Sequence, residues 1–323
     1  MRFHVKPRLW FMYILIIIVA VVWSIFETKP DLSEVSRLSQ NKQYGEALQA
    51  VNHILEEYPD DLDALNEQGY LLLRLGRNEE ALLALTKVVE EDPAHAAALN
   101  HLAWAYHNLS LQRIANAYID RALLIGQNTD IQYVNKANIE LALNNYANAL
   151  KYYDLALKLN AGSENAAFGK GLAYYRQANY QQAVVWLSKH LALVPDDQDG
   201  WNYLVSAYLK SNDYAGAIGE YQKRIEQEPG NVQLLVSLGG VYTTMREYGK
   251  AIELFDQAIG QNPEFAQAYY EKGLSMIMTG DYDAACDQLV LAVRYNKDYL
   301  YSFKDEPKLD KIKQLPKFKQ LFM

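Results

Sequence analysis

Three histidines, His95, His101 and His107, follow one another at steps of six residues and are the first candidates for a metal site. Each residue of an α-helix turns by about 100°, so a step of six rotates a side chain by about 240°. The three imidazoles therefore cannot share one helix face, and we predict no metal site. The sequence contains no phosphate-binding glycine loop, no nucleophile elbow and no zinc-protease motif.

The single cysteine, Cys286, excludes an intrachain disulfide and a cysteine-based zinc cluster. It stands next to a regularly spaced alanine, which indicates a small packing residue rather than a nucleophile. Acidic pairs such as Glu56–Glu57 and Glu90–Glu91 lie close to prolines and are explained as solvated helix ends. We predict no catalytic residue, no cofactor, no small-molecule substrate and no enzymatic activity.

The charge balance bears on the class of partner. The chain carries 31 Lys and Arg against 39 Asp and Glu, a formal net charge of -8. Binding to nucleic acid needs clustered basic residues that contact phosphates, so we predict no nucleic-acid partner. Half of the residues are apolar, which is enough for a packed core.

A period of 34 residues organises the chain. Alanine recurs at equal steps of that length, at Ala47, Ala81, Ala115, Ala149, Ala183, Ala217, Ala251 and Ala285. Tyrosine stands three residues before most of these alanines and proline twelve residues after most of them. Apolar residues recur at helical spacing twice in each period, which predicts two antiparallel helices that end at the proline. One such hairpin cannot bury its apolar faces alone, so the units are expected to stack.

This pattern resembles the tetratricopeptide repeat (TPR) family, whose motif is W-x2-L-G-x2-Y, then A-x3-F, then P. The best match consists of Leu238, Gly239, Tyr242, Ala251, Phe255 and Pro263. The resemblance implies an all-α, right-handed α-solenoid of about eight helix hairpins. We place its units at 28–61, 62–95, 96–129, 130–163, 164–197, 198–231, 232–265 and 266–299. Unit 28–61 departs from the motif at Asp31 and Val35. We therefore predict that it is a degenerate repeat that caps the stack. Lys136 and Glu140 stand in the core pattern of unit 130–163, which predicts a local irregularity.

The resemblance also implies that the first helices line a concave groove and contact ligands from recurring positions. The fifth residue of a unit gives Asn66, Asn100 and Asn202, the ninth gives Tyr70, Trp104 and Asn138, and the thirteenth gives Arg74, Arg176 and Lys210. A carboxamide can bond both the N–H and the C=O of an extended peptide, and an exposed aromatic ring supplies apolar contact. We predict that these nine residues bind peptide. The alternative is that Asn and Tyr are merely tolerated there.

Residues 9–26 contain no charge and predict a transmembrane anchor. Arg2, Lys6 and Arg8 precede it, so the positive-inside rule predicts that residues 1–8 are cytoplasmic. The repeats would then lie on the periplasmic or extracellular side of a single-pass membrane protein. A cleaved signal peptide and a buried soluble helix are the alternatives for the same segment.

Residues 300–323 differ from the repeats, with Leu309, Ile312, Leu315 and Phe318 spaced by three and lysines between them. We predict a capping tail that covers the last repeat, the alternative being a basic amphipathic segment. The sequence as a whole predicts a membrane-anchored scaffold or adaptor of the cell envelope that binds partner proteins or peptides through its groove. The alternative is an anchored receptor or chaperone-like protein whose repeats face the cytosol and capture extended polypeptides.

Overall fold

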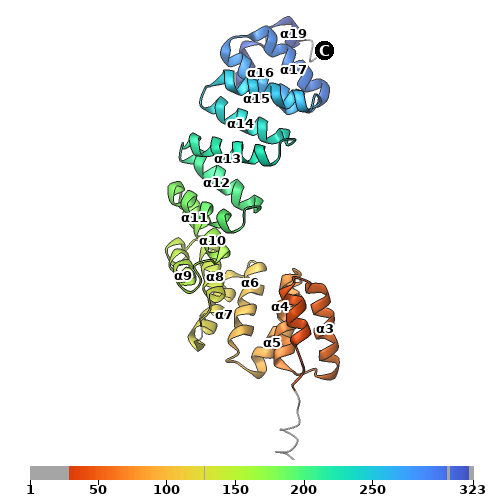
Figure 1. The fold of residues 1–323 in the computed structure, drawn as a ribbon, viewed down its shortest axis with the longest axis vertical. Coiled ribbons are helices and arrows are strands. Elements are labelled where there is room, and N and C mark those ends of the chain that lie inside the picture. The colour runs from red at the N-terminus through yellow and green to blue at the C-terminus, as the bar shows by residue number, and fades with distance from the viewer. Residues whose placement is uncertain (1–28, 127, 304–305, 320–323) are drawn as a thin grey trace, which may run out of the picture. The chain divides into compact units, whose positions relative to one another are not determined.

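The computed structural model of the chain describes residues 29–126, 128–303 and 306–319 (Figure 1). It divides into two compact units, unit 1 up to Ala173 and unit 2 from Tyr174 onward. All the regular structure within these ranges is helical, which confirms the predicted all-α fold of stacked hairpins. Its handedness and the division into eight repeat units stay predictions.

Unit 1 consists of helix pairs followed by the greater part of α10, in which the unit boundary falls. Its helices are α2 (Ser33–Gln40), α3 (Tyr44–Glu57), α4 (Leu62–Arg74), α5 (Asn78–Glu91), α6 (Ala96–Asn108), α7 (Gln112–Ile125), α8 (Asp130–Ala142), α9 (Tyr146–Leu159) and α10 (Glu164–Arg176). Helix α2 has 8 residues where α4 has 13, so the first pair is the shortest.

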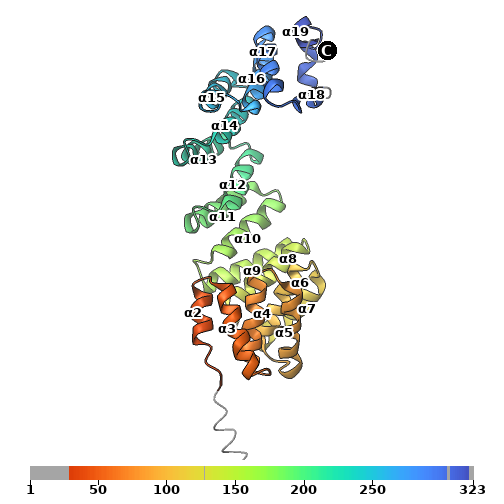
Figure 2. The ribbon, with the colours of Figure 1, turned by 90° about the vertical axis from the view of Figure 1, so that its right-hand side faces the viewer.

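Unit 2 continues the same alternation and closes with short helices (Figure 2). Its helices are α11 (Tyr180–Leu193), α12 (Gln198–Lys210), α13 (Tyr214–Gln227), α14 (Val232–Thr244), α15 (Tyr248–Gln261), α16 (Ala266–Thr279), α17 (Tyr282–Tyr295), α18 (Tyr299–Ser302), the 3-10 helix η1 (Pro307–Lys311) and α19 (Pro316–Lys319).

The alanine column marks where the two helices of a hairpin approach each other. All eight alanines of the column have no exposed surface. The same approach explains the glycine of the family motif: a Cβ atom on Gly239 would lie 2.4 Å from Cε1 of Phe255, which is itself fully buried. A small residue in one helix thus leaves room for a large one in the other, and this pairing sets the packing of the hairpin.

A left-handed residue connects the helices of each hairpin. Positive φ angles recur every 34 residues, at Lys42, Gly76, Ser110, Asn144, Ala178, Asn212, Arg246 and Gly280. The N–H of the next residue donates to the carbonyl five positions back, as Arg77 does to Leu72 at 2.9 Å. This bond is the helix-ending motif that normally favours glycine at the left-handed position. Here six of the eight positions carry another residue, with φ between 58° and 62°.

The irregularity predicted for unit 130–163 is absent from its first helix, because α8 is continuous over 13 residues. Its two buried charges compensate each other: Lys136 Nζ lies 3.0 Å from Glu140 Oε1 and 2.6 Å from Oδ1 of Asp120. The deviation lies instead in the preceding connection. There Gly126 has a φ of 95°, and Thr129 caps α8 through a capping box with Gln132.

The segment after α17 packs against the last hairpin. Phe303, Leu309, Ile312 and Phe318 are buried in one cluster with residues of α16 and α17 such as Leu289. The ring centroids of Phe303 and Phe318 lie 5.7 Å apart. Apolar side chains of this segment therefore cover the face of the final hairpin that a further repeat would otherwise cover.

The predicted localisation is corrected by the structure. Among residues 29–126, 128–303 and 306–319, no helix combines the length and the apolar character needed to cross a bilayer. The predicted anchor at 9–26 lies outside the described residues. The assignment as a single-pass membrane protein with extracytoplasmic repeats is therefore not supported.

Candidate peptide-binding groove

A groove of about 700 Å³ runs across unit 1. The first helices α4, α6, α8 and α10 supply most of its lining, and Tyr153 of α9 adds to it. Its apolar surface includes Trp104, Val134, Leu141 and Phe168. Five carboxamides are distributed among these side chains, from Asn100, Asn135, Asn138, Asn160 and Asn165. The groove therefore offers apolar area together with groups that both donate and accept hydrogen bonds.

Helical spacing explains why these side chains share one face. Tyr70 and Arg74 are four residues apart in α4, as are Asn100 and Trp104 in α6. Residues four apart lie one above the other on the same side of an α-helix. Because the period of 34 repeats this arrangement in each hairpin, neighbouring first helices present comparable side chains to the same groove.

Hydrogen bonds between side chains join successive first helices along this face. The Nδ1 atom of His101 lies 3.0 Å from Oδ1 of Asn66, and Nδ2 of Asn135 donates to Oδ1 of Asn100 at 2.9 Å. Both pairs are 35 residues apart. In each pair the asparagine uses its oxygen, and among the described residues Nδ2 of Asn100 has no acceptor. That donor is consequently available to a ligand.

An arginine is fixed between two tyrosines at the α4 end of the groove. The guanidinium carbon of Arg74 lies 4.4 Å from the ring centroid of Tyr44, and Nη1 donates to the hydroxyl of Tyr70 at 3.1 Å. The Tyr70 ring is 5.3 Å from His101 and 6.3 Å from Trp104, centroid to centroid. No carboxylate pairs with Arg74 within the part of the chain that the structure describes. Its side chain is exposed and contacts both tyrosine rings.

His101 is neutral at pH 7. Burial, with a smaller contribution from His95, lowers the pKa of His101 to about 4.

The other two histidines of the series have separate roles: His95 caps α6 by accepting from the Ala98 N–H, and His107 lies 2.7 Å from Gln112. Within the described ranges, no group of three His, Cys, Asp or Glu side chains could hold a metal ion. Cys286 is fully buried, and burial raises the pKa of its thiol.

The nine residues predicted to bind peptide are not all brought together. Five of them line the groove, namely Tyr70, Arg74, Asn100, Trp104 and Asn138. Asn66 lies behind this surface, only 8% exposed and bonded to His101. Arg176, Asn202 and Lys210 belong to unit 2 and do not line this groove. Whether any of the nine binds a ligand stays a prediction.

The sequence reasoning did not single out several lining residues. Asn135 occupies the sixth position of its unit, next to the asparagine column at the fifth, and this adjacency was the available signal. Tyr153 comes from a second helix and donates its hydroxyl to Oδ1 of Asn138 at 2.6 Å. Phe168 stands at the fifth position of its repeat, where the prediction used only the asparagines, and Leu141 stands at the twelfth position, which the prediction did not use.

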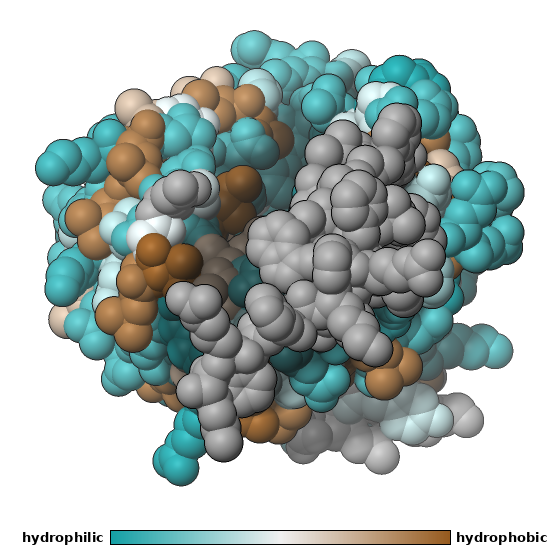
Figure 3. All heavy atoms as spheres, turned by 90° about the horizontal axis from the view of Figure 1, so that it is seen from below, coloured by the Kyte–Doolittle hydropathy of each residue, from teal (hydrophilic) through white to brown (hydrophobic). Residues whose placement is uncertain are grey.

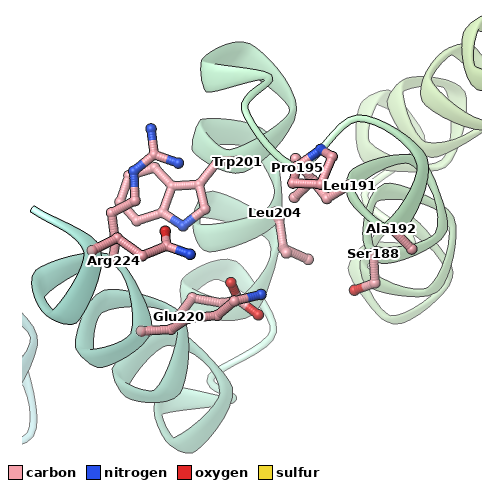
Figure 4. A pocket seen from close by; sticks show the side chains of 10 residues that line it. Ser188, Leu191, Ala192, Pro195, Trp201, Leu204, Glu220 and Arg224 are labelled. Carbon is pink, nitrogen blue, oxygen red and sulfur yellow. The ribbon is translucent and has the colours of Figure 1, made fainter.

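A smaller cleft of about 260 Å³ lies in unit 2 between α11, α12 and α13 (Figure 4). Trp201, Leu204 and Leu191 form much of its wall. The guanidinium of Arg224 lies 5.5 Å from the Trp201 ring and also pairs with Glu228 at 2.7 Å. Arg224 stands where several other repeats have a buried alanine. Since the guanidinium of Arg224 already has protein partners, the groove of unit 1 is the stronger candidate.

In the part of Figure 3 that is not drawn in grey, hydrophobic patches lie among hydrophilic ones. Leu83 and Leu124 are 76% and 86% exposed and lie outside the groove lining. Ile131 is 62% exposed and lines the groove. These residues differ in location but little in exposure, which makes them suitable for matched substitutions.

Comparison with known proteins agrees with this architecture. A family model described as tetratricopeptide repeat matches residues 32–94, 66–123 and 237–299. A model described as anaphase-promoting complex, cyclosome, subunit 3 matches residues 142–224. The chain belongs to the tetratricopeptide repeat family. Repeats of this family are scaffolds for protein–protein interaction, and such scaffolds are typically not enzymes.

Among curated proteins, a peroxisomal targeting signal receptor of Candida albicans is 22% identical over 210 residues, which cover 62% of this chain and 36% of the receptor. The chain therefore spans about a third of that relative. Among solved structures, the anaphase-promoting complex hetero-tetramer Cut9–Hcn1 matches with a TM-score of 0.56 and 17% identity, over 79% of this chain and 51% of that one. The C-terminal part of a TPR repeat-containing protein from Cytophaga hutchinsonii gives 0.59 and 15% identity, over 73% and 98%. At this identity the structural matches show the fold alone.

Proposed function

We propose that this chain is a protein-interaction scaffold whose unit 1 binds an extended segment of a partner protein in the groove. The observation that carries the proposal is the groove lining, in which five carboxamides lie among aromatic and aliphatic side chains. An extended peptide presents the matching features, because its backbone N–H and C=O groups recur along the chain while side chains alternate between them.

The groups of the groove have distinct parts in this proposal. The free Nδ2 of Asn100 donates to a peptide carbonyl, and the apolar area around Trp104, Leu141 and Phe168 receives an apolar side chain. Charged residues are few: the lining includes Arg74, Asp130 and Glu164. One cation against two anions is a poor surface for the phosphates of a nucleic acid.

The test uses peptides selected by the full chain from a library of random 12-residue sequences. Binding of the recovered peptides is then compared between Ile131→Glu and Leu124→Glu. Both substitutions place a carboxylate at an exposed apolar position of unit 1, but only Ile131 lines the groove. We expect Ile131→Glu to weaken binding about tenfold or more, and Leu124→Glu to leave it unchanged. Equal effects of the two variants would place the binding surface elsewhere.

A receptor that captures one targeting segment is the second candidate. The similarity to peroxisomal targeting signal receptors over 62% of this chain favours it. The same selection separates the two functions, because a receptor for one signal enriches a single consensus. A scaffold for extended segments enriches varied sequences that share no continuous consensus.

A further inference from the structure

We infer that the groove of unit 1 selects segments that carry an acidic side chain, which Arg74 binds at the α4 end. This inference rests on the proposed function and specifies the class of segment that the groove accepts. It is carried by the geometry of Arg74 and by the distribution of charge along the lining.

Arg74 is positioned before any ligand arrives. Its guanidinium stacks 4.4 Å from the Tyr44 ring centroid and donates one N–H to Tyr70, which leaves other N–H groups unused. A planar guanidinium matches the two oxygens of a carboxylate. Because two tyrosines already restrict the side chain, less conformational entropy is lost when the carboxylate binds.

Two other arginines of unit 1 pair with carboxylates of the protein. Arg37 pairs with Glu34 at 2.7 Å within α2, and Arg77, the N-cap residue of α5, pairs with Glu80 at 2.6 Å. Arg74 lines the groove and has no such carboxylate among the described residues. A carboxylate from a ligand would therefore gain a cation that no carboxylate of the described residues already neutralises.

The charge at the other end of the groove gives the selection a direction. Asp130 and Glu164 are lining residues at the beginning of α8 and α10, whereas Arg74 is the last residue of α4. An acidic side chain bound near Asp130 and Glu164 would meet like charge, which disfavours that register. The preferred segment consequently has its acidic residue at one fixed distance from the apolar residue bound beside Trp104.

The experiment repeats the selection from random 12-residue peptides on the wild-type full chain, Arg74→Gln, Arg74→Glu and Arg121→Gln. Arg121 is the matched control, since its guanidinium lies 5.6 Å from the Tyr118 ring but it does not line the groove. We expect the wild type and Arg121→Gln to enrich Asp or Glu at one position. Arg74→Gln should lose this enrichment, and Arg74→Glu should replace it with Lys or Arg.

For a single acidic peptide recovered on the wild type, we expect Arg74→Gln to weaken binding on the order of fivefold, with a smaller effect at high salt. Arg74→Lys should keep the acidic preference. If the enriched peptides depend on Ile131 but keep the same acidic residue in every Arg74 variant, the groove stands and acid recognition is overturned. If no enriched peptide depends on Ile131, the proposed function fails, and this inference fails with it.

Discussion

Gly76→Ala tests whether the left-handed turn matters energetically. Gly76 connects α4 and α5 with a φ of 76°, and a Cβ atom placed there would meet nothing within 4 Å. Packing is therefore unchanged, and the cost lies in the backbone alone. An L-residue in the left-handed region costs about 1–2 kcal/mol. Alanine also reduces the entropy of the unfolded chain, which returns about 0.4–1 kcal/mol. We expect a net loss of about 1 kcal/mol in the free energy of unfolding.

Gly45→Ala is the matched control in the same compact unit, unit 1. Gly45 lies in the first turn of α3, its Cβ would also meet nothing within 4 Å, and it has no positive φ. Alanine there adopts the native backbone without strain, so the same chemical change should stabilise the chain by roughly 0.5–1 kcal/mol. The two substitutions are thus expected to have opposite signs.

The assay is urea unfolding of the full chain, followed by circular dichroism. With a typical slope of about 1–3 kcal/mol per molar urea, Gly76→Ala should lower the midpoint of the first transition by roughly 0.3–1 M. Gly45→Ala should raise it. If both variants move the midpoint in the same direction, or Gly76→Ala leaves it unchanged, the left-handed backbone conformation does not destabilise alanine at position 76.

Two further predictions concern buried polar groups. Lys136→Met leaves Glu140 buried without its cation and should lower the free energy of unfolding, measured in urea, by about 3 kcal/mol. The double variant Lys136→Met with Glu140→Leu should recover most of this loss. A double variant as unstable as the single one would contradict this explanation. Burial lowers the pKa of His101 to about 4, whereas the pKa of a histidine in an unfolded chain is about 6.5. Between these two pH values the folded state binds fewer protons than the unfolded state. The free energy of unfolding should therefore fall as the pH is lowered through this range. His101→Gln should flatten this slope in unfolding measured from pH 7 to pH 4, and an unchanged slope would assign it to another group.

The sequence predicted the helices and their contact surfaces well because both depend on spacing. The period of 34 places a small residue wherever two helices meet, and every alanine of that column is buried. The turn was less visible, since Ala178 and Arg246 occupy the left-handed position that Gly76 and Gly280 also occupy. Backbone hydrogen bonds impose that conformation, so the side chain at this position does not reveal it.

The groove was predicted in outline but not in detail. Columns of equivalent positions identified Tyr70, Asn100 and Trp104, because neighbouring first helices present the same positions to one face. They failed at Asn66, whose side-chain oxygen is hydrogen-bonded to His101. A comparison of equivalent positions does not reveal this bond, because His101 lies one repeat and one residue further along the chain. The predicted single-pass localisation was wrong for a different reason: it rested on composition outside the repeats, and no helix in the described part of the chain could cross a bilayer.

The segment that covers the last hairpin also limits how this array can change in length. Phe303 and Phe318 occupy the apolar face of α16 and α17 on which another hairpin would have to stack. A duplicated period of 34 residues inserted after Asn296 would separate this segment from the hairpin it covers, and would have to recreate that face on its own second helix. Duplication of a hairpin inside unit 1 makes no such demand, because α4–α5 and α6–α7 already have neighbours on both sides. Gain or loss of repeats is therefore expected inside the stack, with residues 266–319 kept together as a single inherited block.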